Sequence, residues 1–144
     1  MPQTMNIGTA PSQDEWPAAV IDEFRRNQHN GCVGTQLLSE NERVRVWTIR
    51  LAPGERIGFH RHVLDYFWTA VTAGTALSHT QDGSTGERSY YAGETQHESY
   101  GPGEYKVHDL ENIGGTELVF TTVEFLDSAN EPLPLPDSIR PKGQ

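Results

Sequence analysis

The middle of the chain alternates between apolar and polar residues at the period of a β-strand. The alternation is strongest over 43–51, where Trp47, Ile49 and Leu51 fall on one face and Val44 on the other. Successive side chains of a strand point to opposite faces, so this pattern predicts a strand. The other expected strands are 34–38, the segment that follows Gly54, and 66–71, 75–81, 87–92, 95–100, 105–110 and 118–126.

Tight turns separate these segments. Pro53-Gly54, Ala73-Gly74 and Asp82-Gly83 are turn or hairpin signals that lie between consecutive apolar runs. Many short strands joined by Gly and Pro turns are typical of a sandwich or barrel. We therefore predict an all-β fold of the jelly-roll type.

The N-terminal part has a different period. Trp16, Val20 and Phe24 recur at helical spacing, and Ser12 is a candidate N-cap residue. This pattern predicts a short helix, with an extended edge segment over 18–24 as the alternative.

Three regions follow from these patterns. Residues 1–30 are an N-terminal arm with the short helix, 31–128 are the β-barrel, and 129–144 are a Pro-rich C-terminal tail. Alternating prolines in the tail favour an extended, polyproline-like strap over a helix. We expect this strap either to lie on a neighbouring subunit or to be partly disordered.

Composition narrows the possible partners. A chain of 144 residues suits one domain, and its formal net charge of −9 argues against nucleic acid or an anionic membrane as partner. The sequence shows no apolar run near the roughly 20 residues of a membrane span and no signal peptide. The single cysteine, Cys32, excludes an intrachain disulfide. We expect a cytoplasmic protein.

The histidines carry the candidate chemistry. His60 and His62 lie two residues apart in an expected strand and therefore share one face. His108 lies in a second expected strand. Imidazoles that a rigid scaffold brings together are typical ligands of transition metals. Two other histidines are expected at the surface, His79 in an outer hairpin and His29 in a loop.

These motifs resemble those of the cupin superfamily. The positions that match the two cupin motifs are Gly54, His60, His62, Gly74, His108 and Asn112. The resemblance covers about 43–126 and implies a double-stranded β-helix, the cupin form of the jelly-roll barrel. It also implies that His60, His62 and His108 bind a divalent transition metal, with Fe(II) favoured over Zn, Ni, Mn or Cu.

One position departs from the usual cupin pattern. Tyr66 stands where cupins usually have a Glu as the third metal ligand. The run 60–66 is similar to the same run in small bacterial single-domain cupins labelled beta-alanine degradation proteins. Tyr66 could ligate the metal, donate a hydrogen bond to a bound anion, or pack as a buried Tyr. Asp65 could instead rotate in as a carboxylate ligand. We single out Tyr66 and His97 as candidates to orient a substrate or move a proton, with a surface position as the alternative for His97.

The resemblance implies a metal-binding enzyme that acts on a small organic molecule, and oxygenase chemistry is the leading hypothesis. One alternative is a non-catalytic cupin that binds a small ligand or serves as a sensor. Another is a metal-dependent isomerase or lyase. Arg45 and Arg50 are candidate anchors for a carboxylate substrate or, alternatively, solvated strand charges. Cupins of this size are usually homodimers, and exposed sheet edges are consistent with that.

Overall fold

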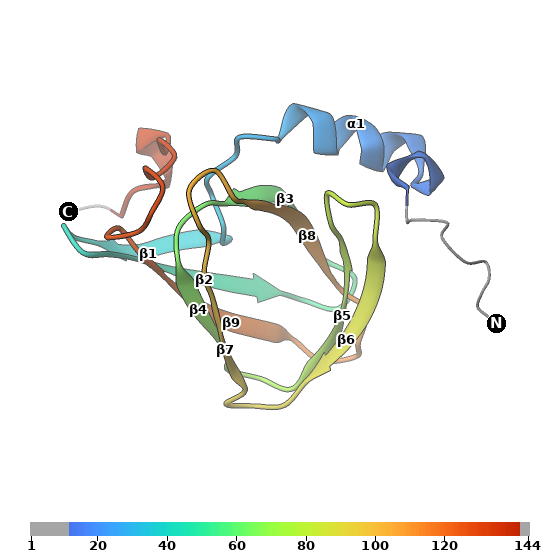
Figure 1. Ribbon diagram of the computed structural model, residues 1–144. Helices are drawn as coiled ribbons and strands as arrows, with labels where there is room; N and C mark the ends of the chain where they lie inside the picture. The colour runs from blue at the N-terminus through green and yellow to red at the C-terminus, as the bar shows by residue number, and fades with distance from the viewer. Residues whose placement is uncertain (1–11, 142–144) are drawn as a thin grey trace.

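The computed structural model describes residues 12–141, and in this part of the chain nine strands form two antiparallel sheets that face each other (Figure 1). The first sheet contains, in spatial order, β1 (Gln36–Glu40), β2 (Val44–Leu51), β9 (Leu118–Phe125), β4 (Tyr66–Ala70) and β7 (Thr95–Glu98). The second contains β3 (Arg56–His62), β8 (Lys106–Asn112), β5 (Gly74–His79) and β6 (Thr85–Tyr90).

The strand pairs are nested. β2 pairs with β9, β3 with β8, β4 with β7 and β5 with β6, so the chain crosses repeatedly from one sheet to the other. This nesting is the topology of a double-stranded β-helix, and it confirms the predicted fold class. It also places the two strands that carry the candidate metal ligands, β3 and β8, side by side.

Apolar residues fill one end of the barrel. Ile49, Leu51 and Leu118 come from the first sheet, and Ala76 and Leu110 come from the second. In β2 the residues at 45, 47, 49 and 51 are buried and those between them are more exposed, as the alternation predicts. The opposite end of the barrel interior carries polar residues.

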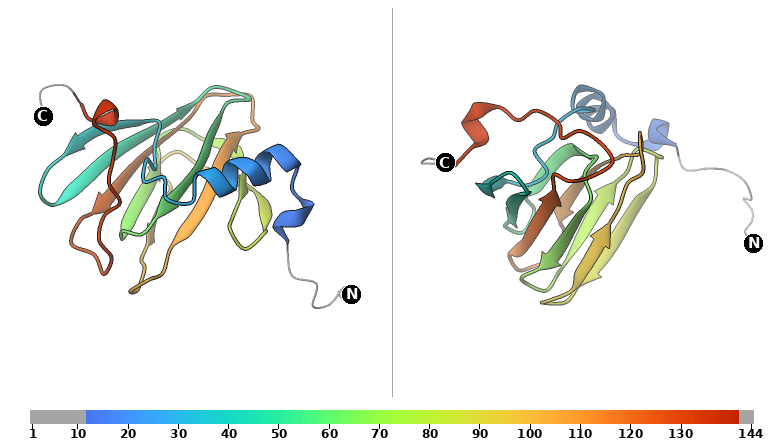
Figure 2. Two further views of the ribbon diagram at one scale, coloured as in Figure 1. Left: turned by 90° about the horizontal axis from the view of Figure 1, so that it is seen from above. Right: turned by 60° about the vertical axis from the view of Figure 1, so that its left-hand side comes forward.

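The predicted N-terminal helix is present but begins later than its cap candidate. Ser12 caps a short 3-10 turn, η1 (Gln13–Glu15), and α1 (Ala18–Arg26) follows with Pro17 as its N-cap. Trp16 stacks on Phe59 of β3, with ring centroids 5.6 Å apart. α1 thus lies on the outside of the barrel beside β3 (Figure 1 and Figure 2).

The C-terminal tail packs on its own barrel as far as residue 141. Leu135 is buried in a cluster with Val33, Leu37 and Trp47, and Arg45 donates a hydrogen bond to the carbonyl of Leu133 at 3.1 Å. A second 3-10 turn, η2 (Asp137–Ile139), follows. Before η2 the described part of the tail has no helix or strand, and Leu133 and Leu135 contact the barrel of this chain. In the described residues no helix is long and apolar enough to cross a membrane.

Candidate metal centre

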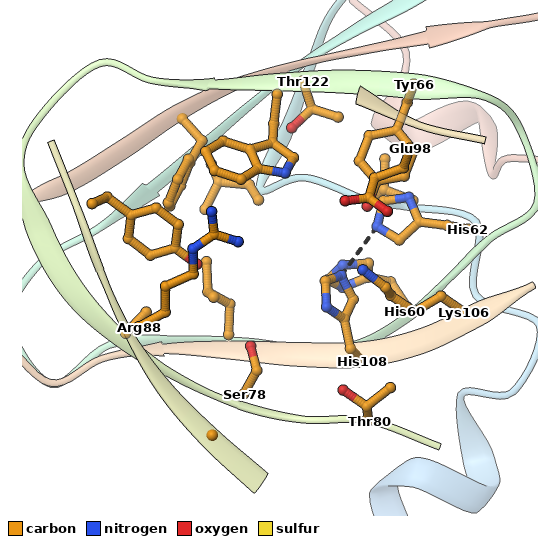
Figure 3. A pocket seen from close by; sticks show the side chains of 18 of the residues that line it. His60, His62, Tyr66, Ser78, Thr80, Arg88, Glu98, Lys106, His108 and Thr122 are labelled. Carbon is orange, nitrogen blue, oxygen red and sulfur yellow. Dashed lines mark hydrogen bonds between the residues drawn. The ribbon is translucent and has the colours of Figure 1, made fainter. Parts of the chain in front are cut away.

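Three imidazoles converge at the polar end of the barrel interior. β3 contributes His60 and His62, and β8 contributes His108, which is paired directly with His60. One ring nitrogen from each histidine lies within 4.8 Å of the other two. The three predicted ligands are therefore brought together, as Figure 3 shows.

A β-bulge sets the direction of His60. The pairing of β3 with β8 shifts between Ile57 and His60, so Gly58 and Phe59 together oppose a single residue of β8. Such a bulge turns the strand and redirects the side chains that follow it. Ile57 and His60 consequently both face the interior, whereas Phe59 packs outward under α1.

Helix α1 caps this bulge with a carboxylate. Glu23 accepts a hydrogen bond from the backbone N–H of Phe59 at 2.9 Å and two from the guanidinium of Arg56 at 2.7 and 2.8 Å. The hydrogen bonds from Arg56 lower the pKa of Glu23. A Cβ at Gly58 would lie 2.9 Å from the Glu23 carboxylate, so glycine permits this close approach.

The same hydrogen-bond network reaches Asp109, the residue that follows His108 in β8. Arg56 donates from Nε to the fully buried Asp109 at 2.9 Å, and Asp109 also accepts from the backbone N–H of His79 at 2.6 Å. His79 Nδ1 lies 2.9 Å from the same carboxylate. The His79 side chain is only 12% exposed, so its expected surface position is wrong. Asp109 draws it inward.

Hydrogen bonding and stacking orient the ligands. His60 Nδ1 donates to the carbonyl of Gly58 at 2.9 Å, which leaves Nε2 for a metal. His62 Nε2 and His108 Nε2 lie 3.1 Å apart. His62 Nδ1 is buried and has no hydrogen-bond partner among the described residues. Stacking on the Tyr66 ring, at 4.1 Å and 13° between planes, holds His62 instead.

The local electrostatics keep the three rings neutral. Burial is the main cause that lowers the pKa of His60 to about 4 and the pKa values of His62 and His108 well below 6.5. A neutral imidazole offers the lone pair that a metal needs, so no proton must be displaced at neutral pH. The three donors therefore fit a divalent transition metal such as Fe, Zn, Ni or Cu.

A cavity of about 330 Å³ lies between the two sheets beside these histidines. Ile49, Trp68, Leu110 and Phe120 form an apolar wall. Polar residues also line it, and those labelled in Figure 3 besides the histidines are Tyr66, Ser78, Thr80, Arg88, Glu98, Lys106 and Thr122. Ser84, Thr85 and Glu87 line it as well. The volume suits a small organic molecule, and the mixed lining is typical of ligand sites.

The structure places the two candidate residues for substrate orientation or proton transfer, Tyr66 and His97, in different environments. Tyr66 is 3% exposed and lines the cavity, and burial raises its pKa well above 10, so it stays a protonated phenol. His97 is exposed on the outer face of β7, where its ring lies 5.5 Å from Phe67. The structure does not bring His97 to the metal centre. Strand alternation turns its neighbour Glu98 into the cavity instead.

Three other candidates also lie away from the cavity. Asp65 accepts a hydrogen bond from the N–H of Tyr100 at 3.0 Å and is not part of the histidine cluster. Arg45 is buried against Glu40 at 2.9 Å, and Arg50 forms an exposed pair with a surface glutamate. Neither arginine lines the cavity.

Four charged residues that line this cavity, Glu87, Arg88, Glu98 and Lys106, were not among the candidates from the sequence. Lys106 lies two residues before His108 in the same strand, so the alternation could have found it. Glu98 required knowledge of the pairing between β4 and β7, in which it lies opposite Tyr66.

Comparison with known proteins yields a structural likeness. No family model matches the sequence, and no curated protein matches it. A cupin domain from Bordetella pertussis Tohama I is 31% identical, and the match covers 62% of this chain and 88% of that one with a TM-score of 0.55. An RmlC-like cupin family protein with a double-stranded β-helix fold from Methanocaldococcus jannaschii is 19% identical, with 62% and 76% covered and a TM-score of 0.51. The second likeness concerns the fold alone.

Proposed function

Because the chain belongs to the cupin superfamily, we propose that it is a metal-dependent enzyme acting on a small organic molecule. The observation that carries this proposal is the convergence of three neutral imidazoles at the wall of a cavity of small-molecule size. His60, His62 and His108 would hold one divalent transition metal. All three ligands are uncharged, so the bound metal would keep its full positive charge.

The metal would supply Lewis-acid or dioxygen chemistry, and oxygenase chemistry with Fe(II) is the leading proposal. Tyr66 would donate a hydrogen bond to the bound molecule, because its phenol stays protonated. Glu98, half-buried in the cavity opposite Tyr66, would accept a proton. The apolar wall would exclude water from the carbon skeleton of the substrate.

A metal-dependent isomerase or lyase is the second candidate. The observation that favours it is the pairing of a protonated phenol, Tyr66, with a carboxylate, Glu98, across β4 and β7. A donor and an acceptor on one cavity wall suit proton transfer next to a metal-polarised carbonyl. This reaction would consume no dioxygen.

Metal analysis tests the shared part of both candidates. We expect protein purified without a His tag and reconstituted anaerobically with Fe(II) to hold one metal per chain. His108→Ala should weaken metal binding by about 100-fold or more, because it removes one of three ligands. The exposed His29 offers a matched control, since His29→Ala should leave metal binding unchanged.

Protein that binds no stoichiometric metal, or the same loss in both variants, would contradict the proposal. Dioxygen uptake with a panel of keto acids, thiols and diketones then separates the candidates. Uptake coupled to product supports the oxygenase, and product without uptake supports the isomerase or lyase. A metal-loaded protein that binds these compounds without converting them would be the non-catalytic binding or sensor protein.

A further inference from the structure

One cationic side chain, that of Lys106, lies beside the predicted metal ligands. Lys106 opens β8 directly opposite His62, and it shares a strand face with His108 two residues later. Its half-buried side chain lines the cavity at the end where the histidines converge (Figure 3). Among the described residues, no carboxylate forms an ion pair with it.

The charge of Lys106 acts on the whole histidine cluster. Burial is the main cause of the low pKa values of His60, His62 and His108, and the positive charge of Lys106 lowers each pKa further. A divalent cation at these histidines would therefore lie beside a second, fixed positive charge. Such an arrangement is favourable when an anion lies close to both charges.

The other charged residues of the cavity limit which anion fits. Arg88, the other Lys or Arg among the described lining residues, is already paired with Glu94 at 2.8 Å and lies over the Trp68 ring. Glu98 places a negative charge near the histidine end. Lys106 is thus the one lining cation without an ion pair among the described residues, and two carboxylate residues, Glu98 and Glu87, also line the cavity. A single anionic group is therefore accommodated, because a second would meet a carboxylate.

We propose that the site takes a small monocarboxylic acid, whose carboxylate is bound by Lys106 beside the three histidines. Its short carbon skeleton lies along the apolar wall of Ile49, Leu110 and Phe120. The inference rests on the proposed function, because it names the substrate class of the same site. It assigns Lys106 as the group that selects and orients the acid.

Titration of the full-length protein loaded with Co(II) tests this assignment, with visible absorption and calorimetry as readouts. The probes are butyrate, its uncharged isostere butyramide, and the dicarboxylate succinate. Butyrate should bind at least about tenfold more tightly than either of the others, since a charge-assisted hydrogen bond is worth roughly that factor. Lys106→Met should weaken butyrate binding by about tenfold and leave butyramide binding unchanged.

Lys106→Arg preserves the charge and should retain butyrate affinity within about threefold, which excludes a folding defect at this position. Arg25→Met removes an exposed cation of α1 and controls for the net charge of the protein. It should leave all three affinities unchanged. Equal butyrate affinity in the wild type and Lys106→Met, or equal affinity for butyrate and butyramide, would overturn the inference.

Failure of the metal proposal gives a different result. If the protein takes up no Co(II), the proposed function fails, and calorimetry on the metal-free protein still tests Lys106. Butyrate binding that depends on Lys106 supports the carboxylate site without a metal. Butyrate binding that is equal in Lys106→Met, or absent from the wild type, overturns it.

Discussion

Tyr66 occupies the position at which the usual cupin motif carries a glutamate ligand, and its environment defines a different role. Burial raises its pKa well above 10, so without a metal beside it the side chain is a neutral phenol. Its ring stacks on His62, whose buried Nδ1 has no hydrogen-bond partner among the described residues. Tyr66 therefore orients His62 by ring contact, which replaces the usual hydrogen bond to a metal-binding histidine.

A pair of substitutions separates the ring of Tyr66 from its hydroxyl. Tyr66→Phe keeps the stacking and should change metal affinity by less than about threefold, whereas Tyr66→Ala removes it and should weaken binding by about tenfold or more. Competition with a chelating dye measures both values. A large loss in Tyr66→Phe would instead identify the hydroxyl as a ligand. Equal affinities in all three proteins would show that stacking does not orient His62.

Strand register determined which cavity residues could be predicted from the sequence. His60, His62 and His108 share faces that the local alternation already defines, so the sequence was sufficient for them. His97 and Glu98 are adjacent, and a shift of one residue in their strand exchanges the inward and outward faces. The alternation of 95–100 contains too few apolar residues to choose between these faces. The exposed ring of His97 and the inward carboxylate of Glu98 became clear only from the pairing of β7 with β4.

At the scale of elements, α1 contributes to the metal centre through the bulge in β3. The bulge directs His60 inward, and the carboxylate of Glu23 binds the N–H of Phe59 at that bulge and the guanidinium of Arg56. Apolar contacts of Trp16 and Phe24 with Phe59 fix the helix over the same residues. The sequence predicted the helix from its period, but the bulge and its cap depend on contacts between distant segments.

Glu23→Gln tests whether the helix positions His60. The amide keeps an acceptor for the N–H of Phe59 but loses the ionic pair with Arg56, so the free energy of unfolding should fall by about 1–2 kcal/mol. Metal affinity should fall by about threefold to tenfold, because the bulge holds a ligand less firmly. Urea denaturation and chelator competition measure the two effects.

The neighbouring Asp22 supplies the control on the same helix. Its pair with Arg26 is exposed, with side chains 70% and 65% accessible. Asp22→Asn should therefore leave metal affinity unchanged. If Glu23→Gln lowers stability but leaves metal affinity at the wild-type value, the helix supports the barrel without positioning His60.

At the scale of the whole molecule, the sequence was sufficient for the jelly roll because turn signals separate the expected strands and the alternation over 43–51 is clear. The path of the C-terminal tail was not predictable. Its prolines define an extended chain, but the burial of Leu135 beside Trp47 depends on a hollow that exists only in the folded barrel. The homodimer and the cytoplasmic location stay predictions.

The cluster that joins the tail to the barrel adjoins a buried acid that couples global stability to pH. Glu124 of β9 is 3% exposed and accepts a hydrogen bond from Trp47 Nε1 at 2.8 Å. Burial raises its pKa from an ordinary 4.5 to about 7. Between these two values the folded state retains a proton that the unfolded state releases. The contribution of Glu124 to stability is therefore fully present below pH 4.5 and is lost as the pH rises through 7.

Glu124→Gln should remove this dependence, because the amide is neutral at every pH and can still accept the hydrogen bond from Trp47. The variant should be more stable than the wild type by about 2 kcal/mol at pH 8, and the difference should shrink toward zero near pH 5. Urea denaturation across this range measures it. Glu117 is exposed and paired with Arg50, so the free energy of unfolding of Glu117→Gln should change with pH in the same way as that of the wild type. Parallel curves for Glu124→Gln as well would show that Glu124 is already ionised in the folded protein, with Arg45 compensating its charge.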